Sequence, residues 1–68
     1  MKSVGYETSS KVLEVEFESG AVYQYLDVPE RVYKELTRAE SKGRYFNQEI
    51  LDEYEFVRLG TARRAAEG

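Results

Sequence analysis

The feature that most constrains the fold is a pair of alternating segments separated by one glycine-containing loop. In an extended chain, residues 11–17 place Leu, Val and Phe on one face and two Glu on the other, and residues 21–26 form a second such run. A period of two, rich in β-branched and aromatic residues, is typical of half-buried strands. A shorter strand is expected at residues 4–8. These three segments predict a three-stranded antiparallel β-meander.

The apolar period lengthens after residue 28, which indicates a helix. Pro29 suits a first helical turn, and Glu30 complements the positive N-terminal end of the helix dipole. Gly43 is expected to end this helix, because glycine readily adopts a positive φ. Its apolar stripe consists of Val32, Leu36 and Ala39, with Tyr33 at the flank.

A second, shorter helix is expected after Asn47, whose side chain can cap its first turn. Its apolar residues are Ile50, Leu51 and Tyr54, and Phe56, Val57 and Leu59 are expected to continue the packing. The predicted fold class is therefore α+β, a three-stranded antiparallel β-meander followed by two helices packed on one face. Residues 1–59 are expected to form a single domain, and residues 60–68 a flexible C-terminal tail.

Composition excludes several classes of protein. The chain has 68 residues, a formal net charge of −3, no Cys and no His. A disulfide scaffold and a thiolate zinc site are excluded, and the commonest acid–base residue is missing. No apolar run approaches the roughly 18 residues of a membrane span, and no signal-peptide pattern opens the chain. We expect a cytoplasmic domain with no membrane contact, no metal and no cofactor.

The spacing of Tyr23 and Tyr25 places both rings on one face of a strand, and two hairpin registers decide which face. A three-residue loop at 18–20 pairs the tyrosines with Val15 and Leu13 on the apolar face. A two-residue loop exposes both rings, which then form a platform for stacking unpaired RNA bases. Gly20 fits the last position of a three-residue loop, which favours the buried register.

Basic residues recur at three- and four-residue spacing along the first predicted helix. Such a stripe can contact phosphates, and a neighbouring Tyr45 can stack on a base. The alternative is an ordinary solvated face, supported by a Glu30–Lys34 spacing that allows an ion pair. The candidate nucleic-acid-binding residues are Arg31, Lys34, Arg38, Lys42, Arg44 and Tyr45.

Catalytic motifs are missing from the sequence. It contains no phosphate-binding loop, dinucleotide fingerprint or nucleophile elbow. Glu14, Glu16 and Glu18 alternate along one strand, but nothing distinguishes the pKa of one carboxyl from another. They also lack the spacing of a calcium loop, so a polar outer face of the sheet is the favoured interpretation. We expect a protein that is not an enzyme.

Several motifs together resemble the KTSC domain, a small family found at the C-terminus of some lysyl-tRNA synthetases and as stand-alone bacterial proteins. They are the segment from Gly20 to Pro29 with its Tyr-x-Tyr core, Val32-Tyr33, Leu36, the segment from Ala39 to Asn47, and Tyr54. The resemblance covers residues 3–59 and implies, through the synthetase fusion, an RNA-binding role. The matching positions are Tyr23, Tyr25, Ser41, Gly43, Tyr45, Phe46 and Asn47.

These matching positions also have structural explanations. Gly43 can supply a helix stop, Asn47 a cap and Phe46 a core side chain, whereas Ser41 can bond to a helix end. Two functions remain in competition. The first is binding of tRNA or single-stranded RNA by the basic stripe. The alternative is a protein-interaction module that uses a sheet edge, at residues 4–8 or 22–26, for a partner or for self-association.

Overall fold

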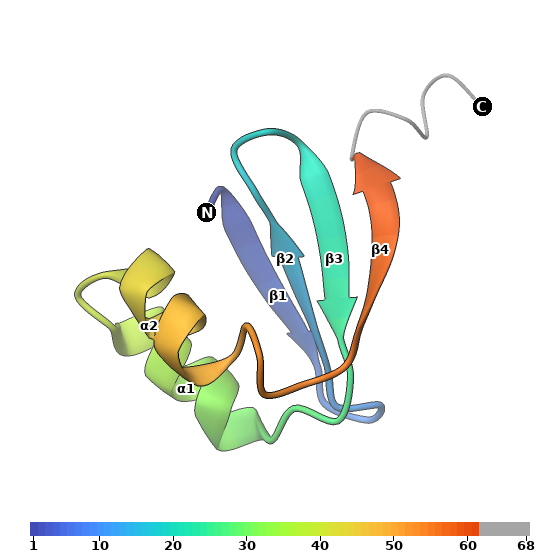
Figure 1. Cartoon of the computed structure of the whole chain (residues 1–68). Coiled ribbons are helices and arrows are strands. Elements are labelled where there is room, and N and C mark those ends of the chain that lie inside the picture. The colour runs from blue at the N-terminus through green and yellow to red at the C-terminus, as the bar shows by residue number, and fades with distance from the viewer. Residues whose placement is uncertain (62–68) are drawn as a thin grey trace.

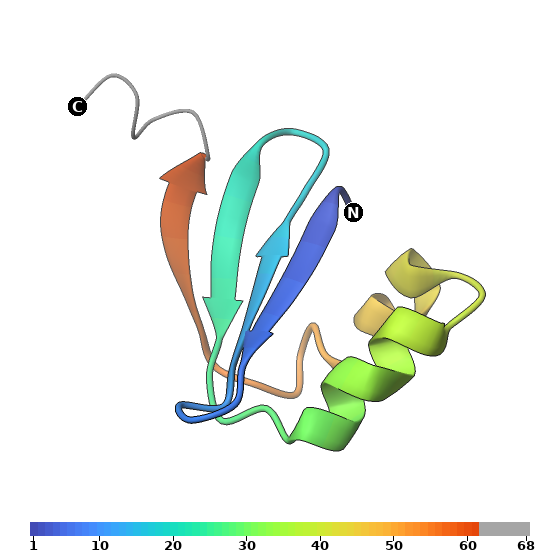
Figure 2. The same ribbon diagram turned by 180° about the vertical axis from the view of Figure 1, so that it is seen from behind.

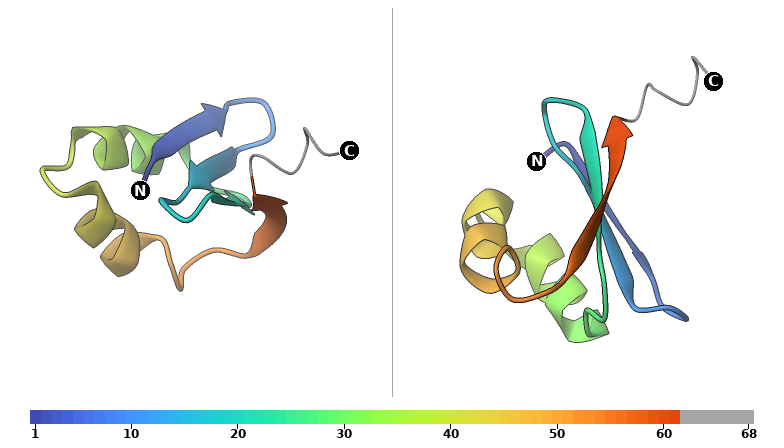
Figure 3. Two further views of the ribbon diagram at one scale, coloured as in Figure 1. Left: turned by 90° about the horizontal axis from the view of Figure 1, so that it is seen from above. Right: turned by 45° about the vertical axis from the view of Figure 1, so that its right-hand side comes forward.

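The computed structural model, which describes residues 1–61, is an α+β fold in which one antiparallel sheet carries two helices on the same side (Figures 1 and 3). Neighbouring strands follow the order β1-β2-β3-β4, so β1 and β4 are the two edges, as Figure 2 also shows from behind. The elements are β1 (Ser3–Glu7), β2 (Val12–Glu16), β3 (Ala21–Tyr25), α1 (Glu30–Arg38), α2 (Lys42–Glu49) and β4 (Phe56–Thr61). The predicted fold class and the three-stranded meander are confirmed.

The β2–β3 hairpin adopts the register that buries the tyrosines. Val15 lies opposite Tyr23 and Leu13 lies opposite Tyr25. The loop is closed by the Gly20 amide, which donates to the Phe17 carbonyl at 2.8 Å, and Gly20 has a φ of 94°. A positive φ is open to glycine without steric cost, so this one residue determines which face of β3 meets the core.

A fourth strand is found where Phe56, Val57 and Leu59 were expected only to continue the packing of the second helix. β4 pairs antiparallel with β3, with Tyr25 opposite Phe56 and Tyr23 opposite Arg58. Gly60 and Thr61, expected at the start of a flexible tail, also pair with β3. The rest of the expected tail, residues 62–68, lies outside the described residues.

The core lies between the sheet and the helices. Tyr6 of β1 fastens the sheet to α1, because its ring stacks on Tyr33 at a centroid distance of 5.2 Å and its hydroxyl donates to the Val28 carbonyl at 2.6 Å. Burial, with a smaller contribution from the charge of Glu30, raises the pKa of Tyr6. The buried cluster consists of Leu13, Val15, Tyr25, Val28, Val32, Leu36, Phe46 and Ile50.

The boundary between the two helices differs from the prediction. α1 ends at Arg38, and Ala39 is extended with a ψ of 141°. Ser41 then caps α2, since its hydroxyl accepts the Arg44 amide at 3.2 Å. Serine is among the best N-caps, so it starts a new helix two residues before the expected glycine stop. Asn47 is therefore an exposed residue inside α2 and not its cap.

The helix-stop prediction for Gly43 is wrong, and the correction can be tested. Gly43 is the second residue of α2, its φ is not positive, and a Cβ added there meets no atom within 4 Å. We expect Gly43→Ala to stabilise the protein by about 0.5 kcal/mol, because alanine loses less backbone entropy in a helix. Gly20→Ala should cost about 1–2 kcal/mol at its positive φ. Urea denaturation of both variants measures the difference, and destabilisation by Gly43→Ala would contradict this assignment.

Candidate functional site

The basic residues of α1 form an exposed stripe, as predicted. Arg31, Lys34 and Arg38 are all exposed on this helix. The expected i,i+4 ion pair is present, with the Lys34 ammonium 3.8 Å from a Glu30 carboxylate oxygen. An exposed pair of this kind contributes only a few tenths of a kcal/mol. The stripe is therefore a solvated surface on which Lys34 is partly neutralised.

Two further cations predicted to extend this stripe belong to the next helix. Lys42 and Arg44 lie in the first turn of α2, after the chain turns at Ala39 and Ser41. Both are exposed. The basic candidates therefore divide between the two helices, three on α1 and two on α2, because the Ser41 cap interrupts the helix that was expected to carry four of them in a row.

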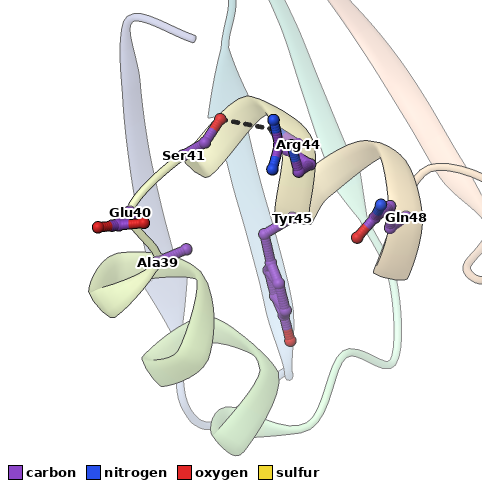
Figure 4. Close-up of a pocket in the computed structure, with 6 residues that line it drawn as sticks. All are labelled: Ala39, Glu40, Ser41, Arg44, Tyr45 and Gln48. Atoms are coloured by element: carbon purple, nitrogen blue, oxygen red, sulfur yellow. Dashed lines mark hydrogen bonds between the residues drawn. The ribbon is translucent and has the colours of Figure 1, made fainter.

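A polar crevice is lined by the connection between the two helices and by α2, and Tyr45 forms part of its wall. Figure 4 shows the Tyr45 ring extending from α2. The Tyr45 hydroxyl donates to a Glu35 carboxylate oxygen of α1 at 2.8 Å. Burial, this hydrogen bond and the Glu35 and Glu49 charges raise the pKa of Tyr45 to about 12, against a lowering by Arg31. The crevice has a volume of about 590 Å³ and is lined by Ala39, Glu40, Ser41, Arg44, Tyr45 and Gln48. Tyr45 thus joins the helices and does not present an open ring for base stacking.

A second surface, which we call the aromatic groove, lies where α2 approaches β3 and β4. Tyr25 is 2% exposed and packs edge-on against Phe46 at 5.3 Å, so one tyrosine of the Tyr-x-Tyr motif belongs to the core. Tyr23 is half-buried, and the Arg58 guanidinium lies 5.8 Å from its ring centroid. The groove has a volume of about 380 Å³ and is lined by Phe17, Ser19, Ala21, Tyr23, Tyr25, Phe46, Asn47, Leu51 and Phe56.

The opposite face of the sheet carries Glu14 and Glu16, as predicted, and also Val57, which lies opposite Gln24. A Glu14 carboxylate oxygen accepts the Gln24 amide at 3.2 Å, and Glu16 accepts the Ser3 hydroxyl at 3.2 Å and pairs with Lys2 at 3.9 Å. No group of three or more His, Cys, Asp or Glu side chains in residues 1–61 is arranged to hold a metal ion. No helix in the same residues combines the length and apolar character of a membrane span.

Reasoning from the sequence missed the aromatic groove, because one of its walls is β4. The only local sign was the run of Phe56, Val57 and Leu59, which was assigned to core packing. All three side chains are instead about half exposed, at 52%, 47% and 52%.

The predicted sheet edge at residues 22–26 is wrong, because β3 lies between β2 and β4. Residues 4–8 do lie at an edge, since they include most of β1.

The fold and these surfaces define a class of small α+β domain, a four-stranded antiparallel sheet covered on one side by a helical pair. The chain belongs to the KTSC domain family, whose match covers residues 1–54. The resemblance found in the sequence is confirmed. β4 lies beyond this match, so the aromatic groove combines residues inside and outside the part of the chain that matches the family.

Known proteins of two kinds are similar to the chain. It is 50% identical over 48 residues to an uncharacterized protein of Stutzerimonas stutzeri, covering 71% of this chain and 68% of that protein. It is 41% identical over 59 residues, 87% of its length, to a lysine–tRNA ligase of Nostoc punctiforme, but it spans only 10% of that ligase. The crystal structure of a KTSC domain protein from Yersinia pestis superimposes with a TM-score of 0.83 and 38% identity, covering 85% of this chain and 82% of that one.

Proposed function

We propose that this chain is a non-catalytic RNA-binding domain, in which basic residues of α1 and α2 contact the phosphates of tRNA or of single-stranded RNA. The observation that carries the proposal is a set of four exposed cations on the helical pair, Arg31, Arg38, Lys42 and Arg44, which form no ion pair with another residue of the described chain. Unpaired cations can replace the counterions of a phosphate backbone, and release of those counterions drives binding.

The net charge of −3 does not exclude this mechanism, because part of the acidic charge lies away from the cations, although Glu40 and Glu49 lie beside and within α2. On the helices, Glu30 pairs with Lys34 and Glu35 accepts the Tyr45 hydroxyl. Glu14 and Glu16 lie on the far face of the sheet, where they bind Gln24, Ser3 and Lys2. A helix is about 10 Å across, which matches the screening length at 0.1 M salt. RNA on the helices is therefore largely screened from the acidic face.

The comparisons support tRNA as the class of ligand. Relatives named lysine–tRNA ligase contain a segment 41% identical to this chain within a protein about ten times as long. A domain of this size joined to an enzyme that handles tRNA is well suited to add phosphate contacts. That relationship is an association and not a mechanism, so the proposal rests on the unpaired cations.

A nuclear magnetic resonance titration tests the proposal. We expect addition of mixed tRNA, or of a short single-stranded RNA, to shift amide signals of residues 31–46, and the shifts should fade as salt rises. Reversing the charge of Arg31 and Arg38 (R31E/R38E) should weaken binding at least about tenfold and reduce the slope of log affinity against log salt by about 1.4, or about 0.7 for each lost phosphate contact.

The matched control reverses two cations elsewhere on the molecule. Lys2→Glu with Lys11→Glu changes the net charge by the same four units but leaves α1 and α2 intact. This variant should retain most of the affinity. Equal weakening by both double variants would indicate a response to net charge alone, and a silent titration at low salt would exclude RNA binding.

A further inference from the structure

β4 is an edge strand with an unusual amount of exposed apolar surface. Within residues 1–61 it pairs with β3 alone, which leaves its outer side without a neighbouring strand. Phe56, Val57 and Leu59 are 52%, 47% and 52% exposed. Exposed edges of this kind tend to accept another strand, and natural proteins usually protect them with charge. The edge of β4 is therefore a candidate pairing surface.

β1, at the opposite edge of the sheet, provides a comparison within the same molecule. β1 ends in the exposed Glu7, and at its start the Lys2 ammonium lies 3.9 Å from Glu16. The strand itself is Ser-Val-Gly-Tyr-Glu, in which Tyr6 turns inward to bond Val28. Each edge strand contains one charged residue, Glu7 in β1 and Arg58 in β4, and each is preceded by a charged residue, Lys2 or Glu55. The two edges differ in exposed apolar surface, because β4 carries three exposed large apolar side chains, whereas Val4 and Tyr6 of β1 are half-buried.

The backbone of β4 determines which residues can bond a further strand. The Leu26 amide donates to the Glu55 carbonyl at 2.8 Å, so these two residues form a hydrogen-bonded pair. Antiparallel partners alternate between hydrogen-bonded and non-hydrogen-bonded pairs. Val57 therefore directs its amide and carbonyl toward Gln24 of β3. Phe56 and Arg58 direct theirs toward the free edge.

We propose that a second copy of this chain pairs antiparallel with the outer edge of β4, in a register centred on Val57. In this register Val57 faces Val57 of the partner subunit, and Phe56 faces Arg58 of the partner subunit on each side of the two-fold axis. All four outward-facing residues then form hydrogen-bonded pairs. The two protomers share one eight-stranded sheet, and both helical pairs lie on the same side of it.

Side-chain chemistry favours this register over its neighbours. A register centred on Arg58 places two guanidinium groups directly opposite each other, which is destabilising. A register centred on Phe56 pairs Arg58 with Tyr54 of the partner subunit, outside the strand. The Val57 register stacks each Arg58 on an aromatic ring, as Arg58 already does with Tyr23 at 5.8 Å, and buries the two valines against each other. The charge and the apolar groups of β4 are thus complementary to a second copy of the same strand.

A symmetric cysteine tests the register directly. In a non-hydrogen-bonded pair the two Cα atoms are about 4.5 Å apart, which lies within the range that a disulfide spans. The chain has no cysteine, so Val57→Cys introduces a single thiol. We expect Val57→Cys to form a covalent dimer under mild oxidation roughly tenfold faster than Ser3→Cys on the exposed edge of β1, since pairing raises the effective thiol concentration. Equal rates would overturn the proposal.

Sedimentation of the unmodified protein provides an independent test. We expect the average mass to rise from 7.9 kDa toward twice that value between micromolar and millimolar concentration, because a short strand pairing lies at the weak end of protein interfaces. Val57→Lys should remain monomeric. A strict monomer at millimolar concentration would overturn the proposal and leave this edge to a foreign chain. Dimers that persist in Val57→Lys would place the interface elsewhere. Neither outcome depends on whether RNA binds α1 and α2.

Discussion

Replacing Tyr25 with alanine is expected to unfold a large fraction of this protein at 25 °C. The Tyr25 ring is 2% exposed and lies 5.3 Å from Phe46 and 5.6 Å from Phe56. Removing a buried aromatic side chain costs about 3–5 kcal/mol. A single core in a domain of fewer than about 80 residues rarely supplies more than about 3–5 kcal/mol in total. Urea denaturation followed by far-ultraviolet circular dichroism measures the loss.

Two matched variants test whether loss of the buried Tyr25 ring is what destabilises Tyr25→Ala. Tyr25→Phe keeps the ring and removes only the hydroxyl, so its free energy of unfolding should remain within about 1 kcal/mol of the wild-type value. Tyr23→Ala removes the other tyrosine of the motif, which is half-buried at the aromatic groove, and should cost clearly less than Tyr25→Ala. Equal losses at positions 23 and 25 would contradict the inequivalence of the two rings that the structure shows.

The different burial of Tyr23 and Tyr25 also decides whether the Tyr-x-Tyr motif can stack on RNA bases. Burial raises the pKa of Tyr25 and encloses its ring among Phe46 and Phe56, so it offers no face to an unpaired base. Tyr23 is more open, but Arg58 already lies 5.8 Å from its ring. The two tyrosines therefore do not form the exposed stacking platform that the alternative hairpin register would have produced. The proposed phosphate contact by the helical pair involves neither ring.

The first half of the fold was predictable because its determinants are local. Alternation locates β2 and β3, and Gly20 selects the three-residue loop whose register places Leu13 opposite Tyr25. Val32 and Leu36, four residues apart, identify the buried face of α1. Each of these features depends on residues close together in the sequence. Hydrophobic periodicity and turn preferences are therefore enough to predict them.

The second half was less predictable because its structure depends on distant partners. β4 forms against β3, which lies more than thirty residues earlier in the chain, and a bulge between Val22 and Tyr23 breaks the register of the pair. The helix boundary was misplaced because Gly43 is a strong local stop in principle. In this chain Ser41 caps a new helix before that stop can act. The helix that Ser41 starts then places Phe46 and Ile50 in the core.

The candidate site was predicted in its parts but not in its arrangement. Arg31, Lys34 and Arg38 share the exposed stripe of α1 as their spacing implied. Lys42 and Arg44 are displaced to α2 by the misplaced boundary. Tyr45 was expected to face solvent, and its bond to Glu35 could not be foreseen, because it depends on how α2 folds back against α1. The spacing of charges identifies the surface, whereas tertiary packing decides which side chains on it remain free.

Phe46→Ala is the second substitution for which we expect a loss of about 3–5 kcal/mol. Phe46 is 3% exposed and makes edge-on contacts with Phe17 at 5.6 Å and with Tyr25 at 5.3 Å. It is the buried side chain through which α2 meets the sheet, so its removal separates the helix from the hairpin that it covers. The expected result is a strongly lowered urea midpoint, or a protein without native amide signals.

The neighbouring residue provides the control, because Tyr45 lies on the same helix but joins α1. Tyr45→Phe removes only the hydroxyl that donates to Glu35, an exposed hydrogen bond, and should cost about 0.5–1 kcal/mol. It should also leave the RNA titration of residues 31–46 largely unchanged, because no phosphate contact is assigned to Tyr45. If Phe46→Ala were tolerated as well as Tyr45→Phe, the packing of α2 on the sheet would not hold the fold together. If Tyr45→Phe abolished RNA binding while the protein stayed folded, the Tyr45–Glu35 bridge would be part of the binding surface.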